Sequence, residues 1–337
     1  MSMPANRAIL PPPPSAGEIA RWLRALPDGA FAAASAKPLA GDASARRYFR
    51  VAGAGESYIL MHSPLSEKPA QFLAVRRFLE DNGARAPRIF AADEARGFFL
   101  LEDFGDRTYF AAARPGNCAP LYAAAISALV KMQTFPPPDF LPDYGEELLG
   151  GEIALYEEWY CARYLRMPLA AAAKKTFRRA AAFLIQECRA QPQVFVHRDY
   201  HSRNLMHVAN GPGILDFQDA VRGPAAYDIV SLLRDAYIAW SDARQKKWLR
   251  QYREKAADAG VLPHADEETM RRDFNIAGAQ RGLKVLGIFA RLLLRDGKTN
   301  YAKDMPRVHA HLLAACRAVP ELAALEILAR RLPPCAR

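Results

Sequence analysis

The stretch from Phe195 to Ala220, FVHRDYHSRNLMHVANGPGILDFQDA, gathers acids, an amide and histidines beside two short apolar runs. Asp199, Asn204 and Asp216 have side chains that can hold a divalent cation or accept a proton. Asp199 follows an apolar run that predicts the end of a strand, and the runs NLMHV and GILDF predict a β-hairpin across ANGPG. We therefore expect the hairpin to bring Asn204 and Asp216 together, with Asp199 on the preceding loop.

This combination of residues suits phosphoryl transfer. Amide and carboxylate oxygens are ligands for Mg²⁺, which also keeps water and phosphate oxygens. With Asn204 and Asp216 on the metal, Asp199 can orient a hydroxyl and accept its proton. The spacing H-x-D-x-x-x-x-N followed by D-F is the kinase pattern for these roles. Each residue alone is more often a turn residue or a helix cap, but their common register favours a phosphotransferase that uses ATP and Mg²⁺.

Three motifs carry a resemblance to a known family: HRDYHSRN followed by ILDFQDAVRGPAAYDIVSLLRD, LLEDFGD, and LAGDASARRYFRV. They resemble the aminoglycoside phosphotransferase and choline kinase superfamily, and most closely the bacterial anomeric sugar kinases of peptidoglycan recycling, which phosphorylate N-acetylmuramate and N-acetylglucosamine at C1. The resemblance runs from about Leu39 to the C-terminal helices. It implies a protein-kinase-like fold, with Asp199 as the catalytic base and Asn204 and Asp216 as the Mg²⁺ ligands.

The resemblance also implies a nucleotide site. The hinge, residues 100–106, would meet adenine through its backbone, and a glycine-bearing loop would approach the phosphates. The residues expected to bind the nucleotide are Gly41, Ala43, Ser44, Ala45, Arg46, Glu102, Asp103 and Phe104. The loop carries one glycine where protein kinases have three, and Met61 and His62 stand where the protein-kinase lysine is expected. Arg46 or Arg47 could offset the phosphate charge, or these side chains could face water.

Further residues are expected around the acceptor. His201 and Arg203 lie on the catalytic loop, and Arg203 could pair with the lactyl carboxylate of N-acetylmuramate. Glu158 and Trp159 offer a polar group and an aromatic face for a sugar, although a core stripe would explain the aromatic residues equally well. By the resemblance, His197 is a packed support of the loop. Asp228 is either the buried acid that holds the loop or an ordinary first-turn helix residue.

Periodicity predicts the elements that position these residues. Residues 17–26 form an amphipathic helix, residues 45–53 and 56–64 a β-hairpin, residues 70–83 a helix, and residues 86–93 and 97–106 strands; helices dominate from Thr108 onward. The fold class is α+β and bilobal, with a small mixed β-sheet N-lobe and a mainly helical C-lobe. The expected organisation is a Pro-rich arm (1–17), a nucleotide-binding lobe (18–104) and a helical lobe (107–337) that holds the catalytic loop and acceptor site.

Composition bounds the remaining possibilities. The 337 residues are 51% hydrophobic and carry a formal charge of +10, with 13 Lys and Arg against 5 Asp and Glu from Arg271 onward. Such basic residues usually form a solvated face, although an anionic substrate is also compatible. No run is long and apolar enough for a membrane span, and the scattered cysteines indicate reduced thiols. We expect a cytoplasmic protein, a monomer, with no nucleic acid or membrane partner.

Other functions stay open from the sequence alone. The same motif could serve another small alcohol, such as an aminoglycoside, choline or maltose. The missing lysine would suit a nucleotide-binding pseudokinase, although Asp199, Asn204 and Asp216 are all present. A basic nucleic-acid binder would use the C-terminal arginines, but no recognised reader motif supports it.

Overall fold

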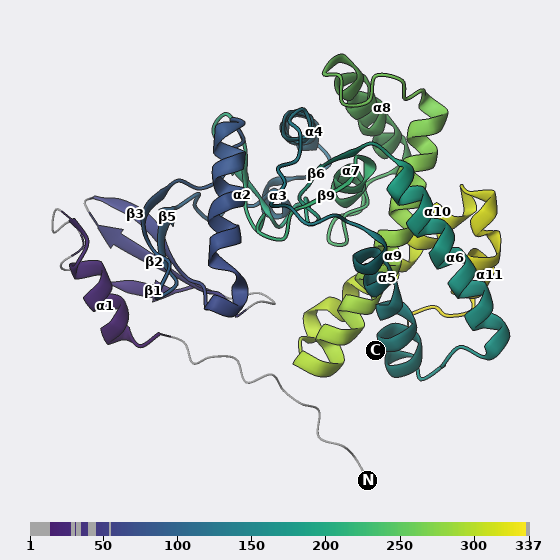
Figure 1. Ribbon diagram of the computed structural model, residues 1–337, viewed down its shortest axis with the longest axis horizontal. Coiled ribbons are helices and arrows are strands. Elements are labelled where there is room, and N and C mark those ends of the chain that lie inside the picture. The colour runs from purple at the N-terminus through teal and green to yellow at the C-terminus, as the bar shows by residue number, and fades with distance from the viewer. Residues whose placement is uncertain (1–13, 28–30, 32–34, 40–44, 54, 335–337) are drawn as a thin grey trace, which may run out of the picture. The chain divides into compact units, whose positions relative to one another are not determined.

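The computed structural model of the chain describes residues 14–27, 31, 35–39, 45–53 and 55–334. These residues form two compact units (Figure 1). The first comprises Met1–Arg107 with Gly213–Gln218, and the second comprises Thr108–Pro212 with Asp219–Arg337. The segment Gly213–Gln218, which the sequence analysis assigns to the helical lobe, groups with the first unit. The expected arm, residues 1–17, lies mostly outside the described residues, and its last two residues belong to the first helix.

The first unit is built on a five-stranded sheet in the order β1-β2-β3-β5-β4. Its elements are α1 (Ala16–Arg24), β1 (Ala36–Pro38), β2 (Arg47–Gly53), β3 (Glu56–His62), the 3₁₀ turn η2 (Leu65–Glu67), α2 (Pro69–Asp81), β4 (Ile89–Asp93) and β5 (Phe98–Glu102). The β2–β3 hairpin pairs Arg47 with His62 and Gly53 with Glu56, as predicted.

Helices cover both faces of this sheet. The side chains of β5 alternate between the faces: Phe98 and Leu100 join the core cluster of Trp22 from α1, whereas Phe99 contacts Phe72 from α2 at 5.7 Å between ring centroids. Ser15 caps α1 through a capping box with Glu18, which explains where that helix begins. The α1 and α2 helices were both predicted from periodicity.

One detail of the predicted sheet was wrong. The sheet was expected to be mixed, but every described strand pair in it is antiparallel. The reason lies in the crossover through α2. This crossover joins β3 to β4, which run in the same direction, but β5 lies between them and pairs antiparallel with both.

The second unit is mainly helical. Its elements are α3 (Tyr109–Ala112), α4 (Cys118–Gln133), α5 (Glu146–Leu155), the π-helix η3 (Tyr156–Tyr164), α6 (Ala171–Ala190), β6 (Gln193–Val196), β7 (Leu205–Val208), β8 (Gly211–Ile214), β9 (Val221–Pro224), α7 (Ala226–Leu233), α8 (Asp242–Asp258), α9 (Glu267–Asp296), η4 (Thr299–Asp304), α10 (Met305–Arg317), η5 (Pro320–Leu322) and α11 (Ala323–Arg330). The chain passes to the first unit within β8.

The long helix α9 forms the centre of the second unit. It packs against α5, η3, α6, α7 and α10, and its residues from Phe274 to Gly287 are continuously buried. Gly287 allows α9 to approach α5 closely, because a Cβ at this position would lie 2.5 Å from the carbonyl carbon of Leu155. This close crossing sets the register in which charged side chains of the two helices meet.

The predicted helix over residues 151–165 is two elements. The α-helix α5 continues into the π-helix η3, in which Tyr156, Tyr160 and Tyr164 stack at successive centroid distances of 5.0 and 5.7 Å. These tyrosines are buried, so the core interpretation of this aromatic stripe holds for them. A period of about four residues cannot distinguish an α-helix from a π-helix, so the change could not be predicted from the spacing of the aromatic residues.

Two expectations from composition concern the cysteines and membrane-spanning segments. The four described cysteines, Cys118, Cys161, Cys188 and Cys316, are free and buried, whereas Cys335 lies outside the described residues. Within the described part of the chain, no helix combines the length and the apolar character that crossing a bilayer would require.

Candidate active site

The HRDYHSRN segment forms a loop between two short strands of the second unit. The strand β6 pairs antiparallel with β9 and ends at Val196, and β7 begins at Leu205. Asp199 lies near the start of this catalytic loop, and its side chain is 40% exposed. The carboxylate is therefore accessible while its surroundings are largely buried.

Asp228 fixes the start of the catalytic loop. Its carboxylate is fully buried and accepts hydrogen bonds from the backbone N–H groups of His197, at 2.6 Å, and Arg198, at 3.0 Å. Burial raises the pKa of Asp228 to about 6, against the opposing effects of the His197 charge and of these hydrogen bonds. This is the geometry of an acid that holds the loop rather than one that reacts.

His197 supports the same turn from inside. Its ring is buried, and its Nδ1 atom accepts the backbone N–H of Asp199 at 3.3 Å. The ring also meets Tyr200 edge-on at 5.8 Å between centroids. These contacts hold the ring in place within the turn.

A second acid, Asp235, holds the other end of the loop. Its carboxylate is buried and accepts the backbone N–H of Ser202 at 2.8 Å and of Tyr237 at 2.7 Å. The role of Asp235 was not predicted, although this residue ends the motif ILDFQDAVRGPAAYDIVSLLRD, just after α7. The catalytic loop is therefore fixed at both ends by carboxylates that follow β9.

Two buried cations from α9 lie around Asp199. The Arg281 guanidinium is 3.4 Å from Asp199 Oδ1 and donates to the carbonyl of Arg198 at 2.9 Å. Burial alone would raise the pKa of Asp199, but the charges of Lys284 and Arg281, with smaller contributions from His201 and Arg198, outweigh it and hold the pKa well below its usual range. Solvent screens part of this effect, because the carboxylate is partly exposed. Asp199 is thus held in its ionised form.

Glu152 of α5 balances these cations. Its carboxylate lies 3.1 Å from Lys284 Nζ, contacts Arg198, and also accepts hydrogen bonds from Tyr144 and Gln280. Arg198 has a left-handed backbone, with φ at 73°, which directs its side chain toward this acid. Burial raises the pKa of Glu152, but Lys284 and Arg198 more than compensate and lower it. The sequence offered no signal for this cluster, since its members come from three distant segments.

Asn204 and Asp216 occupy different units. The Asn204 amide donates to the backbone carbonyl of Asp199 at 3.0 Å, which orients the amide whose oxygen would bind a cation. Asp216 belongs to the first unit, is exposed and has φ at 62°, and its Oδ1 atom accepts a hydrogen bond from Gln218 at 2.8 Å. The expected meeting of Asn204 with Asp216 stays a prediction.

Aromatic contacts attach the Asp216 segment to the first unit. Phe217 stacks on Phe72 of α2 at 5.1 Å between centroids, and the N–H of Ile214 donates to Arg85 at 2.8 Å. Gly213 lies against the Phe104 ring, where a Cβ would be only 2.6 Å from a ring carbon. These contacts explain why the segment groups with the hinge rather than with the helices.

The acidic side chains of the predicted hinge are paired inside the first unit. Glu102 binds Arg85 with contacts of 2.5 and 2.7 Å, and Asp103 binds Arg50 and Ser57 at 2.7 and 2.6 Å. The backbone N–H and carbonyl of Phe104, in contrast, have no hydrogen-bond partner among the described residues. The acids therefore shape the hinge, while the backbone at Phe104 has groups that adenine could bind.

The glycine-bearing loop is described only at its end. Gly41, Ala43 and Ser44 lie outside the described residues, whereas the N–H of Ala45 donates to Glu67 at 3.1 Å. Arg46 is 2% exposed and donates to Ser63 Oγ at 3.3 Å and to the carbonyl of Glu67 at 2.7 Å. These contacts favour a structural role for the Arg46 side chain.

The four expected acceptor residues fall into two groups. His201 and Arg203, on the catalytic loop, both contact the Tyr237 ring. Glu158 and Trp159 instead contact Arg163, as an ion pair of 2.7 Å and a cation–π contact of 3.9 Å. No described hydrogen bond, ion pair or ring contact joins Glu158 or Trp159 to the catalytic loop, and their sugar contact stays a prediction.

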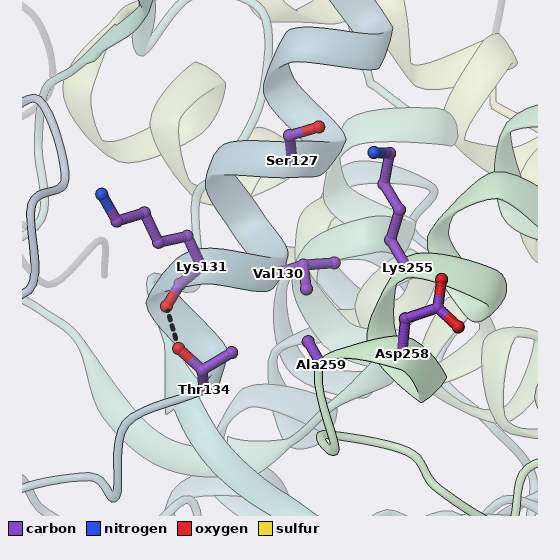
Figure 2. Close-up of a pocket in the computed structure, with 7 residues that line it drawn as sticks. All are labelled: Ser127, Val130, Lys131, Thr134, Lys255, Asp258 and Ala259. Atoms are coloured by element: carbon purple, nitrogen blue, oxygen red, sulfur yellow. Dashed lines mark hydrogen bonds between the residues drawn. The ribbon is translucent and has the colours of Figure 1, made fainter.

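A separate cleft of about 460 Å³ lies between α4 and α8 (Figure 2). Its lining residues are Ser127, Val130, Lys131, Thr134, Lys255, Asp258 and Ala259. Figure 2 shows that Thr134 uses its hydroxyl on the backbone of Lys131, a bond of 2.8 Å. None of the predicted site residues lines this cleft, so it does not bear on the phosphotransferase site.

The donor set is compatible with a hard divalent cation. Among the described residues, no group of three or more His, Cys, Asp and Glu side chains is arranged to hold a metal. The amide of Asn204 and the carboxylate of Asp216 offer oxygen only, which suits an ion that keeps water and phosphate as its other ligands. The donor atoms of the two residues therefore fit Mg²⁺ in chemistry.

Comparison with known proteins places the chain in a family. The sequence profile of the "Phosphotransferase enzyme family" matches residues 35–268. The chain is 43% identical, over 93% of its length and 91% of the relative, to an N-acetylmuramate/N-acetylglucosamine kinase of Pseudomonas putida. It is 41% identical to the protein of the same name from Pseudomonas aeruginosa, over 88% of each chain.

Solved structures agree on the fold. A choline/ethanolamine kinase family protein from Mesorhizobium loti superimposes with a TM-score of 0.62 and 16% identity, covering 92% of this chain and 99% of that one. The predicted α+β, protein-kinase-like fold is confirmed, as is the resemblance to this superfamily. The chain belongs to the phosphotransferase enzyme family.

Proposed function

We propose that this protein is an ATP- and Mg²⁺-dependent kinase that phosphorylates the anomeric hydroxyl of N-acetylmuramate and N-acetylglucosamine, giving ADP and the sugar 1-phosphate. The relatives named for these two sugars match nearly the whole chain. The observation that carries the proposal is the state of Asp199: accessible, ionised, and fixed in a loop held by Asp228 and Asp235. Such a carboxylate suits an acceptor hydroxyl.

In the proposed reaction, the sugar hydroxyl oxygen forms a bond to the γ-phosphorus as the bond from this phosphorus to the β,γ-bridging oxygen breaks. Asp199 accepts a hydrogen bond from the hydroxyl and aligns it, and the proton passes to Asp199 as the new bond forms. A carboxylate with so low a pKa is a weak base, so its main contribution is orientation, for which an anomeric hydroxyl, more acidic than an ordinary alcohol, is well suited. Arg281 keeps the carboxylate in place.

The metal and nucleotide contacts are part of the same proposal. Asn204 and Asp216 would hold Mg²⁺, which when bound neutralises charge on the phosphates. The backbone of Phe104 would bind adenine, with Glu102 and Asp103 shaping the hinge around it. The glycine-bearing loop, with Gly41, Ala43, Ser44, Ala45 and Arg46, would lie along the phosphates, with Arg46 acting through its backbone because its side chain is already paired.

The test is a product assay. Purified protein, ATP and MgCl₂ are incubated with each sugar, and phosphorus NMR is used to look for a phosphate signal coupled to the anomeric proton. The phosphate should be labile in acid and stable in alkali. Asp199→Asn should lower kcat by roughly 10²–10⁴ while ATP still shifts the melting temperature. Absence of a sugar phosphate with either sugar would refute the proposal, and full activity in Asp199→Asn would remove the role of Asp199.

The surroundings of Asp199 argue against a polycationic acceptor. Aminoglycosides carry several positive charges, whereas the charged groups that act most strongly on Asp199 are the cations Lys284 and Arg281. A panel of aminoglycosides, choline and maltose in a coupled ADP assay separates these alternatives. Phosphorylation of one of these compounds, with no activity on either amino sugar, would favour that compound as the substrate.

The remaining parts of the proposal concern the protein's state. We infer a cytoplasmic monomer that binds no nucleic acid, because its substrates are small molecules and ATP is available in the cytoplasm. Light scattering reports the mass of the particle, and cell fractionation reports its location. Salt-dependent binding to oligonucleotides would contradict the absence of a nucleic-acid partner.

A further inference from the structure

We propose that Arg203, stacked on Tyr237, forms a subsite for the carboxylate of an acidic acceptor sugar and so sets the preference between N-acetylmuramate and N-acetylglucosamine. This inference rests on the proposed function and adds a specificity-determining group to it. It concerns residues of the second unit alone.

Arg203 contacts two aromatic rings, which meet each other edge-on. Its guanidinium carbon lies 3.7 Å from the centroid of the Tyr237 ring and 5.1 Å from that of Phe110. Phe110 is 40% exposed, and both Arg203 and Tyr237 are partly exposed. Stacking on Tyr237 occupies one face of the guanidinium and leaves N–H groups at its edge available to a ligand.

In the described part of the chain, no acid neutralises this guanidinium. Among the described residues, no carboxylate lies within ion-pair distance of Arg203, and none of its side-chain N–H groups has a hydrogen-bond partner there. The stacked Arg163 differs in this respect, because it pairs with Glu158 at 2.7 Å. A fixed cation without a counter-charge, four residues after Asp199 in the sequence, is suited to an anion brought by the substrate.

The pair is preorganised by the loop that carries it. The carboxylate of Asp235 binds the backbone N–H groups of both Ser202, which precedes Arg203, and Tyr237. One buried acid thus fixes the backbone of the cation and of the ring beneath it. Preorganisation of this kind lowers the entropic cost of binding.

Aromatic groups continue from this cation. The His201 ring meets Tyr237 edge-on at 5.2 Å, Phe289 lies 6.2 Å from Tyr237, and Tyr301 lies 4.9 Å from Phe289. Phe289 and Tyr301 are buried, whereas the partly exposed rings of His201 and Tyr237 suit the apolar face of a sugar. The ligand class that fits is therefore a sugar with a carboxylate substituent, rather than a neutral sugar alone.

The two proposed acceptors differ in this group. N-Acetylmuramate carries a lactyl ether at C3 that ends in a carboxylate, and N-acetylglucosamine has a hydroxyl there. A guanidinium can bind a carboxylate with two parallel N–H···O bonds, which a hydroxyl cannot reproduce. Removing the charge should therefore affect one substrate and spare the other.

The experiment compares kcat/KM for both sugars in the full-length wild type, Arg203→Gln and Arg203→Lys. We expect Arg203→Gln to lower kcat/KM for N-acetylmuramate by roughly 10- to 150-fold and to change the value for N-acetylglucosamine by less than about 3-fold. Arg203→Lys should lower kcat/KM for N-acetylmuramate by an intermediate factor, since lysine keeps the positive charge but cannot form two parallel N–H···O bonds. Activity on N-acetylglucosamine also shows that each variant is folded.

Arg244→Gln is the matched control. Arg244 also lies over an aromatic ring, that of Trp240 at 5.6 Å, but it donates to the backbone of Pro115 and is not part of the catalytic loop. Its two kcat/KM values should match the wild type.

The outcomes separate the two proposals. Equal losses for both sugars, a raised KM for ATP in Arg203→Gln, or no change for either sugar would each overturn the carboxylate subsite. A raised KM for ATP would place the nucleotide phosphates, not the sugar, at Arg203. If the wild type phosphorylates N-acetylglucosamine but the Arg203 variants show one of these results, the carboxylate subsite is refuted and the proposed function stands. A wild type that is inactive on both sugars refutes the proposed function itself.

Discussion

We expect a large coupling energy in folding for the buried ion pair between Glu152 and Lys284. An exposed pair on the same helical segment should have a small one. Lys284 Nζ lies 3.1 Å from Glu152 Oε1, and both side chains are less than a tenth exposed, at 4% and 8%. The exposed pair, Glu158 and Arg163, is closer at 2.7 Å, but each side chain is 52% exposed. Distance alone would make the second pair stronger, whereas burial favours the first.

The expected magnitudes follow from what each variant leaves behind. Glu152→Gln leaves Lys284 and Arg198 as buried cations without their acid, which should cost about 3–5 kcal/mol of unfolding free energy. Lys284→Met should cost less, about 1–3 kcal/mol, because Arg198 still pairs with Glu152. The double variant should be more stable than additivity predicts, by at least about 1.5 kcal/mol. For the exposed pair, the corresponding coupling should be below about 1 kcal/mol.

The assay is urea unfolding of the wild type and of both double-mutant cycles at pH 7, followed by far-UV circular dichroism. The exposed cycle, with Glu158→Gln and Arg163→Met, is the matched control because its pair lies on the continuation of the same helix. A coupling energy for Glu152 and Lys284 no larger than that of the exposed pair would refute the argument. A changed denaturant slope in a variant would show instead that its unfolded or native state had changed.

Three further predictions concern the site and its support. Arg281→Gln should lower kcat by roughly 10-fold with KM for ATP unchanged, since Asp199 loses its guanidinium contact, and Arg281→Lys should lose less in the same kinetic assay. Gly287→Ala should destabilise the protein by about 1–3 kcal/mol in urea unfolding, because its Cβ would meet the backbone of α5 at 2.5 Å, whereas Gly151→Ala, with nothing within 4 Å, should be neutral or stabilising. Burial raises the pKa of Asp228 to about 6, above the ordinary value of an aspartate, so the folded state binds its proton more tightly than the unfolded state; this contribution to stability is present at low pH and is lost as the pH rises through about 6. Asp228→Asn should flatten that part of a melting-temperature profile, and an unchanged slope between pH 4 and 6 would contradict the assignment.

Most elements of the fold could be predicted from local patterns in the sequence. The β2–β3 hairpin, α1, α2 and the strand that ends before Asp199 follow from periodicity and from turn residues next to one another in the chain. The sheet was predicted to be mixed, but strand order is a long-range property, and the insertion of β5 between β3 and β4 left no local mark in the sequence. The change from α5 to a π-helix at Tyr156 was equally invisible, since both helices place the same aromatic residues on one face.

The residues of the candidate site likewise differ in whether the sequence could predict them. The residues that meet the reacting groups in our proposal, Asp199 and Asn204, lie in one short motif and were found from it. The cations that act on Asp199 come from far along the chain: Arg281 lies 82 positions beyond the acid it contacts, and Lys284 lies further along the same helix. Their spacing from the motif has no fixed value, so no local pattern could reveal them.

The charges around Asp199 show why the motif alone does not define this site. Protein kinases of the serine and threonine type place a lysine two residues after the base, and this chain has His201 there. The cations beside Asp199 instead come from α9, where Arg281 and Lys284 are 5% and 3% exposed. The excess of basic residues after Arg271 is therefore not one solvated face, because two of its members are buried behind the catalytic loop and matched by Glu152. A change in the packing of α9 on α5, such as at Gly287, would then alter the electrostatics of the catalytic loop without touching any residue of the motif.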